Sequence, residues 1–437
     1  MRRRFLIVLR CGRNSVHQRW GHSETANWDL ILCPYQEIEQ PHPECPVIPG
    51  DKWPGLHDFL SRNASWRDYD YIWLPDDDIL TDEATINRFF ELCEEVDAQL
   101  AAPGLSEDSY YSYPMTMANK AFAWRRTTYV EVMVPCFRRS FLETALPSFT
   151  FTRFGTGWGL DFLWCFMLGY QDIFILDETP VFHTRPVGLA RNPGLQERAH
   201  VDFHAIMQGF DIGMLLKSQQ GLETDGTYHA GNDGTFFARL LAGYEHLCPR
   251  YPDFLQVLLI TEIEKIEQKP DEVRFERIRR CLELAARKYR TISHGRPSLV
   301  SSVSDTALSQ DPALEAAGGN DGLITGRPGF QTAIEPEPWW QVDLEQRLGI
   351  SALQIYNGLD RQAEFTRLRI LLSDDGFSWR EIGRKDDDLR FGGADGQPLA
   401  VQFNQPILAR YLRIQALGTT SLQLDQVEVF GSRTGSL

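Results

Sequence analysis

The stretch YDYIWLPDDDIL, at residues 69–80, decides how the first part of the chain is expected to fold. Its apolar beginning, residues 69–74, is typical of a buried β-strand. A proline and three adjacent aspartates follow, Asp76, Asp77 and Asp78. Crowded carboxylates raise one another's pKa unless a cation compensates them. The stretch therefore predicts a buried strand whose carboxyl end carries either a bound cation or a solvated acidic helix cap.

Segments typical of strands and of helices alternate around this stretch. The predicted strands are residues 5–9, 28–33, 69–74, 130–135 and 172–176, and the predicted helices are residues 53–62 and 79–101. Such alternation predicts an α/β domain with a Rossmann-like mixed sheet that is mainly parallel. Ligands of such sheets bind beyond the carboxyl ends of the strands, which is where the three aspartates are expected.

The character of the chain changes twice beyond this domain. Residues 202–290 carry apolar side chains at helical spacing and are predicted as helices that pack on the α/β domain. Short alternating strands with turn signals then predict an all-β jelly-roll sandwich. The predicted organisation is an α/β domain at 1–200, a helical extension at 201–292 and a β-sandwich at 296–437.

The composition indicates a globular protein, and its net charge argues against some classes of binding partner. The 437 residues are 43% hydrophobic and carry a formal net charge of −16, which argues against a broad surface for nucleic acid or anionic lipid. The apolar run at residues 5–9 is too short for a signal peptide or a membrane span, and the eight cysteines form no CxxC pair. We therefore expect a cytoplasmic protein with no transmembrane segment, for which peripheral membrane association stays open.

Asp76 and Asp78 are spaced so that both could reach one ion from an irregular turn, while Asp77 points elsewhere. Mg²⁺ and Mn²⁺ are the usual partners of such oxygen ligands. An ion held there could bind a diphosphate and stabilise it as a leaving group. Metal-dependent phosphohydrolases also use aspartate clusters, so that chemistry remains an alternative.

The motif FGTGWGLDFLW, at residues 154–164, combines three glycines with an acid. Gly155, Gly157 and Gly159 permit unusual backbone conformations and close approach of a ligand. Asp161 follows directly and could either cap a helix or accept a proton from an acceptor hydroxyl.

The motif DETPVFHTRPVG, at residues 177–188, carries His183 and Arg185. His183 could complete the coordination of an ion at Asp76 and Asp78, although a lone histidine is more often structural. Arg185 could contact a phosphate.

Together with VEVMVPCFRR, at residues 130–139, these motifs resemble the plant and bacterial DUF707 family, which is regarded as a group of GT-A-like glycosyltransferases. The resemblance covers about residues 1–190. It implies that Asp76 and Asp78 act as a D-x-D motif, Gly155, Gly157 and Gly159 as the glycine loop, Asp161 as the acidic catalytic residue and His183 as the third metal ligand. The cluster reads DDD, so Asp77 is an alternative to Asp78, and the acidic position reads Leu-Asp rather than Glu-Asp.

In a GT-A-like fold the donor binds at the end of the first strand. This implies that Arg10 or Arg13 meets the diphosphate and that the backbone near Gly12 meets the base. Lys52 is a further phosphate candidate at the start of a predicted helix, and Asp77 is a further donor contact. Arg10, Gly12 and Arg13 could equally belong to a solvated polar loop.

The end of the chain resembles the discoidin, or factor 5/8 type C, family, which includes carbohydrate-binding modules. The resemblance covers about residues 296–433 and rests on NDG at 320–322, PWWQVDL at 338–344, IYNGLD at 355–360, LLSDDGFSW at 371–379, ARYLRI at 409–414 and EVFG at 428–431. It implies a structural Ca²⁺ near Asp321 and Glu428, although either could be a turn residue or an exposed charge.

The two resemblances predict a bacterial-type, Mn²⁺- or Mg²⁺-dependent glycosyltransferase of polysaccharide biosynthesis. It would move a sugar from a nucleotide sugar to a glycan or another hydroxyl acceptor and would carry an appended carbohydrate-recognition module. The alternative is a lectin-like binding protein without catalytic activity.

Overall fold

The computed structural model describes residues 4–38, 46–186, 193–231, 234–263, 272–285, 291–358, 367–387, 389–394 and 397–432. The chain forms two compact units. The first unit comprises residues 1–149, 157–196 and 212–270, and the second comprises residues 150–156, 197–211 and 271–437.

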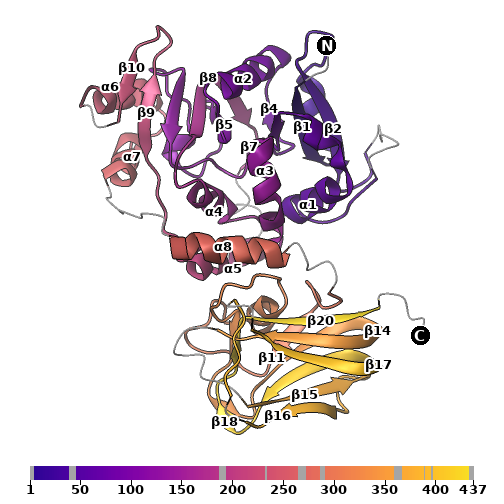
Figure 1. The fold of residues 1–437 in the computed structure, drawn as a ribbon. Helices are drawn as coiled ribbons and strands as arrows, with labels where there is room; N and C mark the ends of the chain where they lie inside the picture. The colour runs from indigo at the N-terminus through magenta and orange to yellow at the C-terminus, as the bar shows by residue number, and fades with distance from the viewer. Residues whose placement is uncertain are drawn as a thin grey trace. The chain divides into compact units, whose positions relative to one another are not determined.

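The first unit is built on one mixed sheet with the strand order β10-β9-β6-β8-β5-β7-β3-β1-β2, and β4 pairs with β8 (Figure 1). The pairing is parallel between β1 and both its neighbours and between β5 and β8, and antiparallel elsewhere. The sheet is therefore mixed rather than mainly parallel. Its strands are β1 (Phe5–Cys11), β2 (Trp28–Pro34), β3 (Tyr71–Trp73), β4 (Ile79–Leu80), β5 (Leu100–Leu105), β6 (Trp124–Thr127), β7 (Cys136–Arg138), β8 (Ile173–His183), β9 (Ser218–Leu222) and β10 (Tyr228–Ala230).

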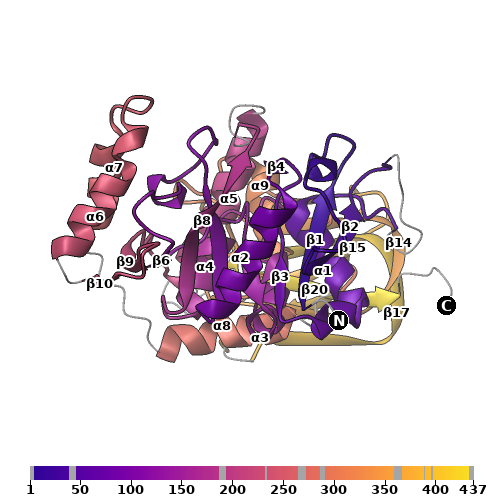
Figure 2. The same cartoon turned by 90° about the horizontal axis from the view of Figure 1, so that it is seen from above.

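Helices pack against the strands of this sheet: α2 packs against β8, and α1 contacts β1 and β2 (Figure 2). Asp82 begins α2, because its carboxylate accepts a hydrogen bond from the N–H of Thr85 at 2.9 Å. The helices of the first unit are α1 (Lys52–Arg62), α2 (Glu83–Glu95), α3 (Arg139–Ala145), α4 (Leu160–Met167), α6 (Gly234–Tyr244) and α7 (Phe254–Ile263). None of the helices in the described ranges combines the length and the apolar character that a membrane crossing requires.

Two predicted elements of the first unit differ from the structure. The helix predicted at residues 79–101 is divided into β4, α2 and β5, because α2 begins at its aspartate cap and Asp97, with φ 52°, follows its end. The strand predicted at residues 130–135 is a loop between β6 and β7. Its side chains are largely buried, as in a strand, but its carbonyls bond to the loop after β3: the N–H of Leu74 donates to Pro135 and the N–H of Asp76 to Met133.

The second unit contains an all-β sandwich. Its six-stranded sheet has the order β11-β14-β17-β15-β16 with β20 paired to β14, and β12-β19 and β13-β18 form two-stranded sheets. Buried apolar side chains that include Trp340, Ile350 and Leu412 fill its core. The strands are β11 (Ser298–Val300), β12 (Phe330–Gln331), β13 (Glu335–Pro336), β14 (Trp339–Tyr356), β15 (Leu368–Ser373), β16 (Arg380–Lys385), β17 (Leu399–Ala416), β18 (Thr419–Thr420), β19 (Gln423–Leu424) and β20 (Gln426–Ser432).

Residues 201–292 were predicted as a helical extension that packs on the α/β domain. In the structure this range also contains two strands, and part of it belongs to the second unit. Residues of this range form β9 and β10, which extend the large sheet beside β6. Their sequences, SQQGL and YHA, lack the apolar alternation that marks a half-buried strand, so the helical pattern around them dominated the prediction. Most of α5 (Pro193–Phe210) and all of α8 (Glu272–Ala285) belong to the second unit, which also contains α9 (Pro312–Ala316).

Candidate functional site

The structure brings Asp76, Asp78 and His183 together. One ligand atom from each lies within 4.8 Å of the other two. The aspartates follow β3, and the antiparallel pairing of β4 with β8 places Ile79 opposite His183. The cluster therefore forms because two segments more than a hundred residues apart share one strand register.

Hydrogen bonds fix the orientation of the His183 ring. Its Nδ1 lies 2.8 Å from the carbonyl oxygen of Tyr110, and because a carbonyl only accepts, Nδ1 carries the proton. Nε2, which lies 3.5 Å from Oδ1 of Asp78, is therefore the ring nitrogen that a metal would use, after loss of any proton that Asp78 favours there. Burial acts to lower the pKa of His183, but the contact with Asp78 outweighs it and raises the pKa.

Asp77 points away from this cluster. Its carboxylate accepts hydrogen bonds from the N–H of Gly12 at 2.9 Å, the hydroxyl of Tyr35 at 3.3 Å and the guanidinium of Arg185 at 3.2 Å. These bonds tie the loop after β1 to the loop after β3. Of the two alternatives left open by the sequence, Asp78 is thus the residue that faces His183, and Asp77 organises the neighbouring loop.

Two cations lie beside the three carboxylates. The Nζ of Lys52 donates to Oδ1 of Asp76 at 2.6 Å and to the carbonyl of Val132 at 2.8 Å. Arg185 lies 4.0 Å from Oδ2 of Asp78. Burial raises the pKa of Asp76 against the effect of Lys52, whereas His183 and Arg185 lower the pKa of Asp78 although burial opposes them.

An open pocket of about 280 Å³ adjoins the cluster, and Lys52, Asp76 and Tyr35 are among its lining residues. Arg10 also lines it, but its side chain is only 3% exposed and is committed to the fold. Its two terminal nitrogens donate to the carbonyls of Cys33, Pro34, Ile48 and Gly50. Arg10 therefore lacks the free terminal N–H groups that the expected contact with a diphosphate needs.

The neighbouring Gly12 and Arg13 have different surroundings. A Cβ at Gly12 would lie 2.2 Å from the hydroxyl oxygen of Tyr35, so a larger residue would have to displace the exposed Tyr35 side chain. Arg13 is exposed and its Nε donates to the carbonyl of Glu37 at 3.1 Å.

The three glycines before α4 all adopt left-handed backbone conformations, with φ of 80° at Gly155, 76° at Gly157 and 94° at Gly159. A Cβ at Gly157 would lie 2.0 Å from the ring of Trp53, so packing requires the glycine as well. Gly159 is the N-cap residue of α4. Gly155 is counted with the second unit.

Asp161 lies buried in the first turn of α4. Its Oδ2 accepts a hydrogen bond from the hydroxyl of Tyr129 at 2.6 Å, and its Oδ1 accepts one from the N–H of Phe162 at 3.0 Å. Burial raises the pKa of Asp161 to about 6. Both carboxylate oxygens are thus engaged.

Glu131 is a site residue that the sequence reasoning missed. Its side chain is 4% exposed and Oε1 accepts a hydrogen bond from the hydroxyl of Ser112. Its Oε2 is buried without a hydrogen-bond partner among the residues that the structure describes. Burial raises the pKa of Glu131 to about 7; Asp161 and Asp76 act in the same direction and His183 in the opposite one. The sequence offered one sign of this residue: a glutamate inside the apolar run VEVMV, where a charged side chain is rarely buried without a role.

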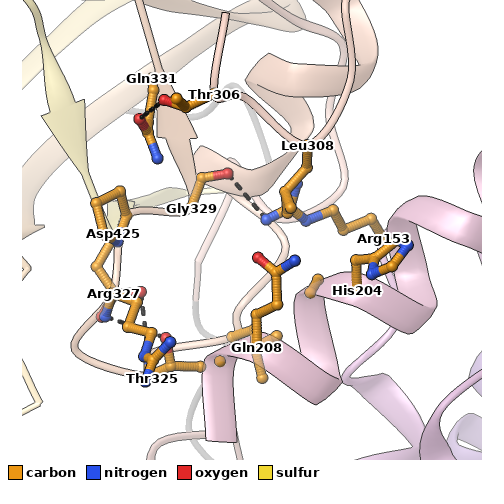
Figure 3. A pocket seen from close by; sticks show the side chains of 14 residues that line it. Arg153, His204, Gln208, Thr306, Leu308, Thr325, Arg327, Gly329, Gln331 and Asp425 are labelled. Carbon is orange, nitrogen blue, oxygen red and sulfur yellow. Dashed lines mark hydrogen bonds between the residues drawn. The ribbon is translucent and has the colours of Figure 1, made fainter. Parts of the chain in front are cut away.

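The second unit has a cavity of its own, of about 150 Å³, shown in Figure 3. Arg153 and Gln208 lie on one side of it, and Thr325, Arg327 and Asp425 on the other. Arg153 donates through Nη2 to the carbonyl of Gly329 at 2.8 Å. The lining combines guanidinium, amide and hydroxyl groups that can hydrogen-bond a polar ligand.

Comparison with known proteins concerns the second unit. Residues 301–424 match the family model described as the F5/8 type C domain. These residues form an F5/8 type C domain. No curated protein matches the chain.

Three solved structures that are similar to the F5/8 type C domain each cover about a third of the chain. The lectin domain of lectinolysin in complex with Lewis B antigen is 26% identical over 32% of this chain and 96% of its own, with a TM-score of 0.26. A fucose binding module of Streptococcus pneumoniae, SpX-3, is 20% identical over 33% and 98%, with a TM-score of 0.28. The family 32 module of Clostridium perfringens NanJ, in complex with galactose, is 16% identical over 30% and 91%, with a TM-score of 0.25.

Asp321 and Glu428, the expected calcium ligands of the F5/8 type C domain, have protein partners. Asp321 accepts from Nε of Arg153 at 2.8 Å and from the N–H of Leu323 at 2.7 Å. Glu428 accepts from the hydroxyl of Tyr356 at 2.8 Å. A buried guanidinium thus provides the positive charge beside Asp321. Among the described residues, the metal-ligand group that converges is Asp76, Asp78 and His183, and neither Asp321 nor Glu428 belongs to it.

Proposed function

We propose that the first unit is a metal-dependent glycosyltransferase of GT-A type, which transfers a sugar from a nucleotide sugar to a hydroxyl of an acceptor. The observation that carries the proposal is the convergence of Asp76, Asp78 and His183 at the ends of β3 and β8. Two carboxylates and one imidazole nitrogen suit Mn²⁺ or Mg²⁺. A divalent ion bound there would supply positive charge for a diphosphate leaving group.

The residues around the cluster suit the handling of a diphosphate. Arg185 already faces Asp77 and Asp78 and is a quarter exposed, so its guanidinium can turn toward a phosphate. Lys52 is held by Asp76 and Val132 at the wall of the adjoining pocket. In this proposal Lys52 and Arg185 bind and orient the donor, while Asp77 holds the loop that carries Gly12.

Release of nucleoside diphosphate from a panel of nucleotide sugars in the presence of Mn²⁺ tests this proposal. We expect release from at least one donor by the wild-type chain and at least a hundredfold less by Asp76→Ala. The absence of release from every donor, or equal release by the variant, rejects the proposal.

We further propose that the F5/8 type C domain recognises a glycan. This part of the proposal rests on the domain family and on the polar cavity between Arg153 and Arg327. If the first unit has no activity, glycan recognition alone would remain as a lectin-like function. Glycan-array binding by the full chain and by Arg327→Gln tests it, with Arg384→Gln as the control, because Arg384 lies on β16 and pairs with Glu381. Equal binding by all three forms argues against the cavity.

A further inference from the structure

The loop at residues 129–135 holds the cluster and the buried acids together. The N–H of Asp76 donates to the carbonyl of Met133 at 2.8 Å, and Lys52 donates to the carbonyl of Val132. At the other end of the loop, Tyr129 donates to Asp161. Glu131 lies between these anchors, so its position is fixed from both sides.

Asp161 and Glu131, the two buried acids, differ in the hydrogen bonds that their carboxylate oxygens accept. Asp161 accepts from Tyr129 on one oxygen and from the N–H of Phe162 on the other. Glu131 uses Oε1 for Ser112, while Oε2 is buried and has no partner among the described residues. A base needs a lone pair within reach of the proton that it removes. Each oxygen of Asp161 already shares one lone pair with the protein, whereas Oε2 of Glu131 shares none with the described residues, so Glu131 is the better suited of the two.

We propose that Glu131, rather than Asp161, takes the proton from the acceptor hydroxyl during transfer. The assignment rests on the proposed glycosyltransferase function. The hydroxyl proton moves to Oε2 of Glu131, the acceptor oxygen forms a bond to the anomeric carbon of the donor, and the bond from that carbon to the diphosphate oxygen breaks. The electron pair of the broken bond leaves with the diphosphate. Direct attack of this kind inverts the anomeric centre.

The surroundings of Glu131 give two other residues positioning roles. Ser112 holds Oε1 and thereby fixes the direction of Oε2. Asp161 acts through Tyr129, which lies two positions before Glu131 on the same loop. Burial also raises the pKa of Glu131 to about 7, which suits a base that works near neutral pH.

The experiment compares Glu131→Gln, Asp161→Asn and Ser112→Ala in the full chain, with Mn²⁺, the donor found active with the wild type and a panel of methyl glycosides as acceptors. We expect Glu131→Gln to lower kcat by about 10²–10⁴-fold, with the KM for the donor and the Kd of the nucleoside diphosphate within threefold of wild type. The acid limb of the kcat–pH profile should disappear in this variant. Ser112→Ala should shift that limb and lower kcat less.

Three results would overturn the assignment, and they are distinguishable. If Glu131→Gln keeps kcat within threefold while Asp161→Asn loses it, Asp161 is the base. If Glu131→Gln loses nucleoside diphosphate binding as strongly as kcat, its role is structural. If the wild type itself releases no nucleotide from any donor, the proposed function fails and the assignment fails with it.

Discussion

The Nε2 atom of His183 lies 3.5 Å from Oδ1 of Asp78, while the Nδ1 of the same ring is held by the carbonyl of Tyr110. A histidine whose second nitrogen donates to a carbonyl has a fixed tautomer and a fixed ring orientation, as metal-binding histidines usually do. The neighbouring Asp77 is turned to Gly12 and Arg185 instead. This division of roles among three consecutive aspartates can be tested by substitution.

The first prediction concerns metal binding. Mn²⁺ at a hundred times its Kd should stabilise the wild type by about 2.7 kcal/mol, because an ion that binds only the folded state stabilises it. Asp78→Asn and His183→Ala should lose this stabilisation, measured as the shift in Tm on adding Mn²⁺. Asp77→Asn is the matched control: it should lower Tm without Mn²⁺ but keep the Mn²⁺-induced shift. A lost shift in Asp77→Asn together with a retained one in Asp78→Asn would reverse the ligand assignment.

The second prediction concerns pH. The pKa of Glu131 rises from 4.5 to about 7 on folding, so the folded state binds more protons than the unfolded state between these values. The free energy of unfolding should therefore fall as pH rises from about 4.5 to about 7, by about 2–3 kcal/mol for this group. The raised pKa of Asp161, about 6, acts in the same direction from 3.8 upward.

Glu131→Gln should remove the part of the pH dependence of the unfolding free energy that the Glu131 carboxyl contributes. In urea unfolding with EDTA present, the variant should be more stable than the wild type at pH 8 and no more stable at pH 4.5. Parallel stability–pH curves for the two proteins would contradict the burial of a titrating carboxyl at this position.

The third prediction separates two arginines near the pocket. Arg10→Met should lower the free energy of unfolding by about 3–5 kcal/mol, because four carbonyls lose a buried charged donor. Arg185→Gln removes a partly exposed ion pair and should cost no more than about 1 kcal/mol. Its affinity for nucleoside diphosphate should fall about tenfold. A stable Arg10→Met variant with weakened nucleotide binding would restore the phosphate contact expected from the sequence.

The strands that the sequence predicted well are those whose apolar runs coincide with backbone pairing. Residues 5–9 and 28–33 lie within β1 and β2, and the first of these strands is buried throughout. Residues 130–135 have a similar composition, yet their backbone bonds to the loop after β3 instead of to a neighbouring strand. The residue composition of a segment predicts whether it is buried. It does not predict which distant segment its backbone N–H and C=O groups hydrogen-bond.

For the candidate site, too, local sequence predicts some features but not the contacts between distant segments. The position of Asp76 and Asp78 at a strand end follows from local sequence, but their contact with His183 depends on the β4–β8 register. Glu131 was missed because a single acid in an apolar run gives no periodic signal. The engagement of Arg10 by four carbonyls depends on where residues 33–34 and 48–50 lie, which no local pattern specifies.

The fourth prediction concerns Arg153 and calcium. The ion pair between Arg153 and Asp321 is almost fully buried, with side-chain exposures of 4% and 2%. Arg153→Met leaves the Asp321 carboxylate buried without its neutralising guanidinium and should destabilise the second unit by about 3–5 kcal/mol. In Asp78→Asn, whose proposed metal site is removed, Ca²⁺ should leave the Tm of the second unit unchanged, because the Arg153 guanidinium already neutralises the Asp321 carboxylate. A rise in Tm with Ca²⁺ that Asp321→Asn abolishes would place an ion at Asp321 after all.

The central claim is that Asp76, Asp78 and His183 form a metal site that binds a nucleoside diphosphate. Calorimetric titration of the chain with nucleoside diphosphates, with Mn²⁺ and with EDTA, tests it directly, since it requires neither an acceptor nor an activated sugar. We expect at least one nucleoside diphosphate to bind with Mn²⁺, and to bind at least tenfold more weakly with EDTA or to Asp78→Asn. Binding that is equally strong without Mn²⁺ and in Asp78→Asn, or no binding of any nucleoside diphosphate, would contradict the claim.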